Sequence, residues 1–452
     1  MLELNKRPNN LLKNPLIGGL FKSRLFPGVL QWITLVVFSF IVYQTLWGPS
    51  SAHDNFGSAA TWILWWPLIP LIFLLLGRFW CAICPFATVS DVFQKLFGAN
   101  LAVPRFLKKY GIWIIDILFV LITWSDHVFG VVESPRGSGY LLMLIFTGVV
   151  VAALFFERRT WCRYLCFLGG LSGNYSRAAA LELRATPEIC ATCNTQACFK
   201  GGEKAPGCPM FEFPRTMDTN SKCNLCGYCV KNCPNDSLRL SVRPFTKELW
   251  FVRRPKLEEA ILAVIIMGIV FVQNFTMLQT WPPVLAFLEA LTGTDSYFVT
   301  FSITFAIAMA LPILALTITS AVAGKLVSES VWSTLTKFGY AIIPLDLTAH
   351  IAHNLFHLLA EGLTVVYTAM GVFGMEVHDA SPAILDSAAI QVMQYVLIIV
   401  GTLGSIYTAY RIAKSNYGEP QQKKAFVPYV VLLVILGAVN ILLFYLPMAM
   451  RM

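Results

Sequence analysis

The sequence predicts an α-helical polytopic membrane protein with one polar inserted domain. Of its 452 residues, 56% are hydrophobic and only 13% are charged, whereas soluble domains carry about 25% charged residues. Nine apolar segments approach the roughly 20 residues that an α-helix needs to span a bilayer. The long polar stretch after the fourth segment holds most of the cysteines. We therefore expect the solvent of this chain to be a lipid bilayer.

The nine predicted helices lie at about residues 28–47, 61–77, 111–130, 139–156, 259–279, 297–319, 341–373, 388–410 and 428–447. The seventh is long and contains Pro344, so we expect it to be kinked or to begin as an interfacial helix. These helices divide the chain into three predicted parts. They are an N-terminal membrane domain of four helices, a polar domain and a C-terminal membrane domain of about five helices: 1–156, 157–258 and 259–452.

The positions of the basic residues predict the orientation. If the N-terminus lies inside, all but two of the 34 Lys and Arg residues fall in inner segments, and the exceptions are Arg136 and Arg451. The positive-inside rule then predicts an inside N-terminus, an outside C-terminus and a cytoplasmic polar domain on the cytoplasmic (inner) membrane. The net charge of +9 is thus a topology signal, and it does not indicate nucleic acid binding. The apolar run from Leu30 to Leu46 exceeds the core of a signal peptide, which predicts an uncleaved first helix.

All twelve cysteines occur in closely spaced sets. In the predicted topology they face the cytoplasm, where structural disulfides are rare, so metal binding or thiol chemistry is preferred. Four of them form a bacterial ferredoxin run that ends in a proline: Cys223, Cys226, Cys229, Cys233 and Pro234. Gly227 inside this run permits a close approach of the backbone to a cluster.

A looser run with the same order precedes it: Cys190, Cys193, Cys198 and Cys208. In ferredoxins with two clusters, the fourth cysteine of each run binds the other cluster. This crossed pattern predicts two [4Fe–4S] clusters. One uses Cys190, Cys193, Cys198 and Cys233. The other uses Cys208, Cys223, Cys226 and Cys229.

Two further cysteine pairs follow predicted helices on the inner side, and both are preceded by an Arg-x-Trp sequence. The first is Arg78-Phe79-Trp80-Cys81 with Cys84, and the second is Arg159-Thr160-Trp161-Cys162 with Cys166. Four thiols at neighbouring helix ends are suited to a third metal or cluster site, a redox-active dithiol pair or a copper site with soft ligands. The residues leave these three interpretations open.

The twin cysteine pairs and the double-cluster domain together resemble the membrane polyferredoxins. This family includes the NapH-type quinol dehydrogenase subunits, the NosR-type accessory proteins and the CcoG-type oxidase-assembly proteins. The resemblance extends over about residues 60–240 and carries to the twelve cysteines. It implies electron exchange between the quinone pool or a cytoplasmic donor and other redox subunits, such as a periplasmic cytochrome c or reductase. The five helices after residue 259 exceed the NapH-type pattern.

Five ionisable residues stand at helical spacing in the seventh predicted helix: Asp346, His350, His353, His357 and Glu361. At 3.6 residues per turn they share an arc of about 80° and extend along about 22 Å of helix. Ionisable groups at membrane depth are costly and usually face a bundle interior or a water-filled cavity. We name this set the ionisable stripe and expect it to have a function.

Three interpretations of the ionisable stripe compete. A haem b with two histidine ligands is disfavoured, because the other histidines, His53, His127 and His378, stand near or beyond outer helix ends. A haem shared with a partner and a metal site on His353 and His357 stay open. The favoured interpretation is a quinone and proton site, because histidine titrates near neutral pH and quinol oxidation releases protons.

The leading functional hypothesis is an oxidoreductase component, similar to a quinol dehydrogenase, that passes electrons between membrane quinone and cytoplasmic clusters. A second hypothesis is metal handling, as a copper reductase or a metalloenzyme assembly and delivery factor. A third is a redox sensor. The electron donor, the acceptor and the direction of flow are not encoded in cysteine spacing.

Overall fold

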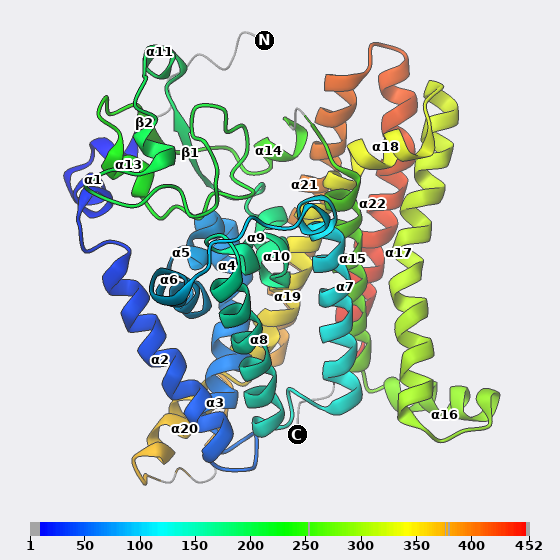
Figure 1. Ribbon diagram of the computed structural model, residues 1–452. Helices are drawn as coiled ribbons and strands as arrows, with labels where there is room; N and C mark the ends of the chain where they lie inside the picture. The colour runs from blue at the N-terminus through cyan, green and yellow to red at the C-terminus, as the bar shows by residue number, and fades with distance from the viewer. Residues whose placement is uncertain (1–9, 252–253, 376, 378–379, 449–452) are drawn as a thin grey trace. The chain divides into compact units, whose positions relative to one another are not determined.

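The computed structural model describes residues 10–251, 254–375, 377 and 380–448 (Figure 1). Arg451 and His378 lie outside the described residues. Within them, eight helices are long and apolar enough to cross a membrane, and a bent pair gives a ninth if it is counted as one span. The predicted α-helical membrane fold is confirmed.

Seven of these candidate spans are single helices: α2 (Gly28–Trp47), α7 (Arg105–Phe129), α8 (Pro135–Phe155), α15 (Leu257–Thr276), α17 (Tyr297–Val327), α21 (Ser387–Asn416) and α22 (Gln421–Tyr445). The eighth is the run Phe56–Phe97. Its parts are α3 (Phe56–Ser58), the π-helical η2 (Ala59–Trp65), α4 (Trp66–Leu76), η3 (Gly77–Phe79), α5 (Trp80–Ile83) and α6 (Pro85–Phe97).

The bent pair contains the ionisable stripe. It consists of α18 (Val331–Phe338), η4 (Gly339–Ile342), α19 (Ile343–Ala360) and α20 (Leu363–Val372), and the bend of 51° separates α19 from α20. The kink predicted at Pro344 is not found there. Pro344 stands in the first turn of α19, where a missing N–H removes no helical hydrogen bond. The helix ends instead at Glu361, whose φ and ψ are −125° and 1°.

The remaining helices are short: η1 (Leu11–Lys13), α1 (Pro15–Lys22), α9 (Thr160–Tyr164), α10 (Phe167–Tyr175), α11 (Pro187–Ala191), α12 (Ala197–Lys200), α13 (Tyr228–Asn232), α14 (Lys247–Trp250) and α16 (Trp281–Thr292). One antiparallel sheet of two strands accompanies them, β1 (Leu181–Ala185) and β2 (Leu238–Val242). In its register Leu183 pairs with Leu240.

The chain forms two compact units. The first comprises Met1–Phe40, Leu71–Gly111 and Met143–Glu248, and the second comprises Ile41–Pro70, Ile112–Leu142 and Leu249–Met452. The predicted boundaries of the three-part division stay a prediction.

The first unit contains the sheet and a small apolar core around it. Leu183, Leu225 and Leu240 are buried in this core together with Phe21 and Phe26 from the N-terminal segment. Lys231 donates a hydrogen bond to the carbonyl oxygen of Phe26. The N-terminal segment therefore covers the cysteine-rich domain and completes its core.

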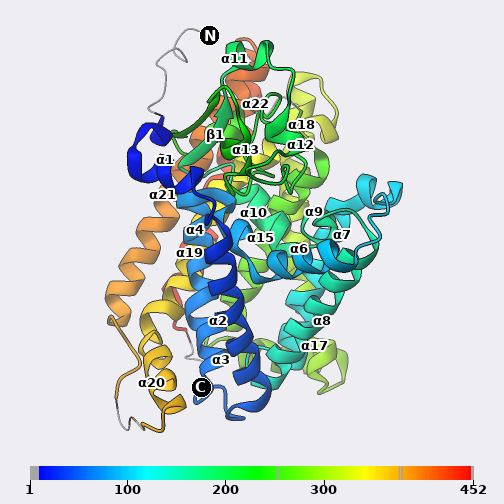
Figure 2. The ribbon, with the colours of Figure 1, turned by 60° about the vertical axis from the view of Figure 1, so that its left-hand side comes forward.

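The second unit is built around α15, the most buried of the candidate spans. Helices α19 and α21 lie side by side in it (Figure 2). A Cβ atom at Gly401 of α21 would stand only 1.8 Å from the hydroxyl of Thr348. Small residues permit this close backbone packing in membrane bundles, so Gly401 holds the stripe helix against its neighbour.

Candidate functional site

Four cysteines from both runs line one cavity of about 320 Å³ in the first unit, which we call cavity one. They are Cys190, Cys193, Cys198 and Cys233. This is the crossed set that the ferredoxin pattern predicts. Short helices present two of these residues, since Cys190 belongs to α11 and Cys198 to α12, while Cys233 caps α13.

Ser237 holds two of the cavity-one sulfurs in place. Its hydroxyl lies 3.0 Å from the sulfur of Cys190, and its backbone N–H donates to the sulfur of Cys233 at 3.3 Å. Hydrogen bonds to ligand sulfurs adjust the potential of an iron–sulfur cluster. Ser237 is a functional residue that the cysteine spacing alone does not reveal.

The other four cysteines line a second cavity of about 370 Å³, which we call cavity two. They are Cys208, Cys223, Cys226 and Cys229. Gly227 lies between two of them with a φ of 76°, and a Cβ there would stand 3.1 Å from the ring of Phe21. The close approach that the sequence predicts for this glycine is therefore made to Phe21.

Burial makes these thiols unfavourable as free anions. It raises the pKa of Cys223 to about 12 and the pKa of Cys226 to about 11. In cavity one, burial followed by the negative charge of Cys233 raises the pKa of Cys198 to about 11. Buried thiolates need a compensating positive charge, which iron supplies in clusters with four cysteine ligands. Both donor sets thus fit a [4Fe–4S] cluster.

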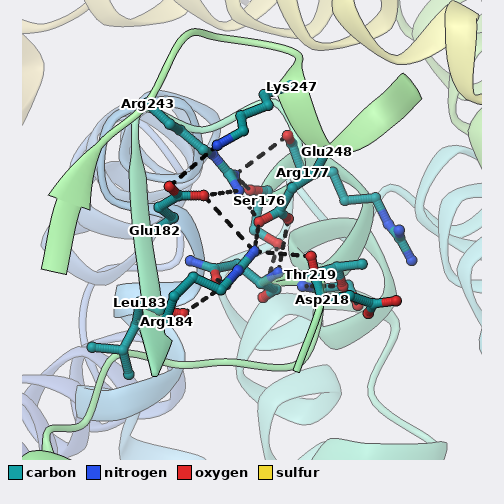
Figure 3. Close-up of polar contacts among 12 residues, drawn as sticks. Ser176, Arg177, Glu182, Leu183, Arg184, Asp218, Thr219, Arg243, Lys247 and Glu248 are labelled. Carbon is teal, nitrogen blue, oxygen red and sulfur yellow. Dashed lines mark hydrogen bonds and ion pairs between the residues drawn. The ribbon is translucent and has the colours of Figure 1, made fainter. Parts of the chain in front are cut away.

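A buried ion-pair network braces the segment that leads into cavity two. Glu248 pairs with both Arg184 and Arg243 (Figure 3). Its second oxygen accepts a hydrogen bond of 2.7 Å from the backbone N–H of Asn220, while Arg184 donates to the carbonyl oxygen of Asp218 at 3.1 Å. The chain just before Cys223 is consequently held by strand β1 and helix α14.

The four remaining cysteines gather at the helix ends of the first unit, and we call them the membrane-end cysteine group: Cys81, Cys84, Cys162 and Cys166. Cys166 follows α9 and its pKa is raised well above the usual value, first by burial and then by the charges of the other three thiols. A Cβ at Gly169 would lie 2.9 Å from the carbonyl oxygen of Cys162 and 3.4 Å from the Cβ of Cys166. The predicted repeat therefore brings its two cysteine pairs together.

The two arginines of the repeat accompany this group. Arg78 is buried, and its guanidinium lies 3.9 Å from the sulfur of Cys81. Arg159 is only 1% exposed and donates to the carbonyl oxygen of Cys81 at 3.3 Å. Asp91 of α6 accepts from Arg158 at 2.8 Å and from Arg159 at 2.7 Å. Sequence reasoning missed Asp91, because its partners stand more than sixty residues away.

No three His, Cys, Asp or Glu side chains converge on a single metal ion within the described part of the chain. This spacing suits a cluster better than one ion, because each cysteine of a [4Fe–4S] site binds a different iron. A mononuclear site on His353 and His357, or on the four membrane-end thiols, is the less favoured arrangement.

The ionisable stripe lies in the second unit, where four of its five residues belong to α19 and are buried: Asp346, His350, His353 and His357. The fifth, Glu361, stands at the helix end but stays on the stripe, with its carboxylate 3.4 Å from Nδ1 of His357. The rings of His353 and His357 are 5.2 Å apart. The helical periodicity thus places the five residues as predicted in sequence order.

Neighbouring helices orient the histidine rings. Nδ1 of His353 lies 2.8 Å from the side-chain oxygen of Asn274 on α15. His350 contacts the ring of Trp66 at 5.9 Å between centroids. An oxygen acceptor at Nδ1 selects the tautomer that carries its proton there and leaves Nε2 as the basic nitrogen. His353 and His357 are both held in this state.

The other described histidines do not approach the stripe's pattern. His53 is exposed, and His127 of α7 bonds to the carbonyl oxygen of Thr123 at 2.9 Å and to Thr276 at 3.3 Å. His378 lies outside the described residues. Haem b with two histidines from this chain stays the disfavoured interpretation.

Comparisons with known proteins bear on the cysteine sites. One family model, described as a 4Fe–4S binding domain, matches residues 58–104 and 138–183, which contain the membrane-end cysteine group. A second model of the same description matches residues 219–239, which contain the ferredoxin run. The resemblance to membrane polyferredoxins is confirmed.

One curated relative carries the printed name "Putative electron transport protein YccM" from Escherichia coli (strain K12). The two sequences are 28% identical over 190 residues, which is 36% of this chain and 51% of the relative. The match thus spans about half the length of that curated polyferredoxin. No solved structure matches the chain.

Proposed function

We propose that this chain is a membrane electron-transfer protein that passes electrons between the quinone pool and two [4Fe–4S] clusters in cavities one and two. The observation that carries the proposal is the division of eight cysteines into two cavities with four cysteines each. The 4Fe–4S binding-domain matches and the name of the bacterial relative support it. Cavity one would hold its cluster with Cys190, Cys193, Cys198 and Cys233.

We place the quinone site at the ionisable stripe. In the quinol-oxidising direction, the quinol gives up two electrons, one at a time, to the iron–sulfur sites. Its two protons pass to Nε2 of His353 and of His357. Glu361, beside Nδ1 of His357, then stabilises the charged imidazole that forms. Asp346 and His350 continue the same buried face of α19.

The positive-inside distribution of Lys and Arg supports a cytoplasmic position for both cavities, on the inner membrane. The lipid bilayer, the quinone and further redox subunits are then the partners of the chain. A copper reductase or a redox sensor would lack quinol-dependent cluster reduction, so the tests below separate these functions.

Serine substitutions test the crossed cluster assignment. Cys226→Ser should abolish the EPR signal of the reduced cavity-two cluster and leave the other signal, because serine is a poor iron ligand. Cys190→Ser should do the reverse. Cys233→Ser is the decisive variant: although Cys233 belongs to the second run, it should remove the same signal as Cys190→Ser. Loss of the same signal in Cys233→Ser and Cys226→Ser would rule out the crossed assignment.

A double substitution tests the quinone site. His353→Ala with His357→Ala should slow quinol-dependent reduction of the clusters by about 100-fold or more, since both proton acceptors are lost. Reduction by dithionite should be unchanged, as followed by bleaching of the visible iron–sulfur absorbance. His127→Ala is the matched control, because His127 is a partly buried histidine away from α19. Normal quinol-driven reduction in the double variant would disprove the stripe's role.

A further inference from the structure

The membrane-end cysteine group is built around one glycine. At Gly169 a Cβ would meet Cys162, Cys166 and a guanidinium nitrogen of Arg78, the last at 3.4 Å. On the other side, the sulfur of Cys81 lies 3.6 Å from the hydroxyl of Ser172 in α10. Both halves of the sequence repeat thus converge on one small space, which a larger residue at position 169 would fill.

The charges around this space are unbalanced without an anion. Arg78, Arg158 and Arg159 bring three positive charges, and Asp91 returns one negative charge. Buried charge without compensation is strongly destabilising. Two further negative charges are therefore needed close to the cysteines.

This balance separates the three interpretations of the group. Two disulfides or four protonated thiols are neutral and would leave the arginines uncompensated. Four thiolates around an oxidised iron–sulfur core form a dianion, which matches the arginine excess. A single zinc or copper ion with four thiolates also carries negative charge, but the described residues do not converge on one ion.

The arginines also connect this group to the lining of cavity two. Arg78 donates a hydrogen bond of 2.7 Å to the carbonyl oxygen of Ser221, two residues before Cys223. Arg158 donates at 3.4 Å to the carbonyl oxygen of Gly207, which precedes Cys208. Two separate bonds thus fix the same cavity relative to the membrane-end cysteines, within the first unit.

We propose that the membrane-end cysteine group holds a third iron–sulfur cluster whose charge is balanced by Arg78 and Arg159. The inference rests on the proposed function, because this cluster would exchange single electrons with the cluster of cavity two. No bond is made or broken in that step, and the iron of one cluster is oxidised as the iron of the other is reduced. The arginines are positioning residues that set the potential of the cluster.

Iron analysis tests the ligand set. Cys162→Ser should remove about one third of the iron and of the acid-labile sulfide, because one of three similar clusters is lost. The EPR signals assigned by Cys190→Ser and Cys226→Ser should both remain. Unchanged iron and sulfide, or zinc or copper at the site in place of iron, would overturn the proposal. Absence of the two other signals in the unaltered protein would instead contradict the proposed function.

The arginine role is tested by redox titration of the third EPR signal. Arg78→Gln should lower its midpoint potential, since removal of a positive charge makes the cluster harder to reduce. Arg78→Lys should restore most of the shift. Lys95→Gln is the matched control, because Lys95 is an exposed cation on α6. An unchanged potential in Arg78→Gln would refute the charge-balance argument, and this variant keeps all twelve cysteines.

Discussion

At the scale of single residues, Gly227 shows how a ferredoxin loop depends on its surroundings. Its φ of 76° is a conformation that other residues adopt at a cost. The hydrogen-bonded turn that follows carries Cys229 into cavity two. In addition, Phe21 from the N-terminal segment packs against the position of a Cβ. The glycine therefore serves both the backbone and the packing of the N-terminus.

Replacing Gly227 by alanine tests this double demand. We expect Gly227→Ala to destabilise the cavity-two region by about 1–3 kcal/mol, because backbone strain and the contact with Phe21 add. The measurement is thermal loss of the cavity-two EPR signal. Gly374→Ala is the control, since Gly374 has a φ of 75° but open space around it. Equal thermal stability of the Gly227→Ala and unaltered proteins would contradict the packing argument.

At the scale of elements, the sequence predicts most of what short-range pattern can determine. Segment 28–47 coincides with α2, and the stripe lies on one helix because a period of 3.6 residues can be read from the chain. Ferredoxin spacing likewise predicts the two sets of four cysteines, since the ligand order is local to each run. The bend after α19 escapes prediction, because Glu361 and Gly362 interrupt the helix while Pro344 does not.

Long-range contacts account for the rest. Asp91 acquires its role only when α6 meets Arg158 and Arg159, and no local signal marks it. Glu248 similarly joins Arg184 and Arg243 from two strands and their flanks. Such buried ion pairs are specified by the fold and not by the neighbours of each residue in sequence. The second coordination environment of the sulfurs, including Ser237, belongs to the same class.

At the scale of the whole molecule, the sidedness of the membrane decides which partners each site can meet. Quinone reaches the ionisable stripe from the bilayer, while soluble carriers reach the clusters from one aqueous face only. Nearly all Lys and Arg residues fall in the segments predicted to be inside. If the positive-inside rule holds, cavities one and two share a side with the loop between α21 and α22.

Protease sites inserted singly into exposed loops test this topology. Insertions after Lys204, in the cysteine-rich domain, and after Gly418, before α22, should be cut only in inverted membrane vesicles, because both lie in segments rich in basic residues. An insertion after Gly293 should be cut only in spheroplasts. Gly293 and Gly418 are a matched pair, since neither has atoms within 4 Å of an added Cβ. Cleavage after Lys204 in spheroplasts would place the clusters outside and exclude a cytoplasmic electron carrier as their partner.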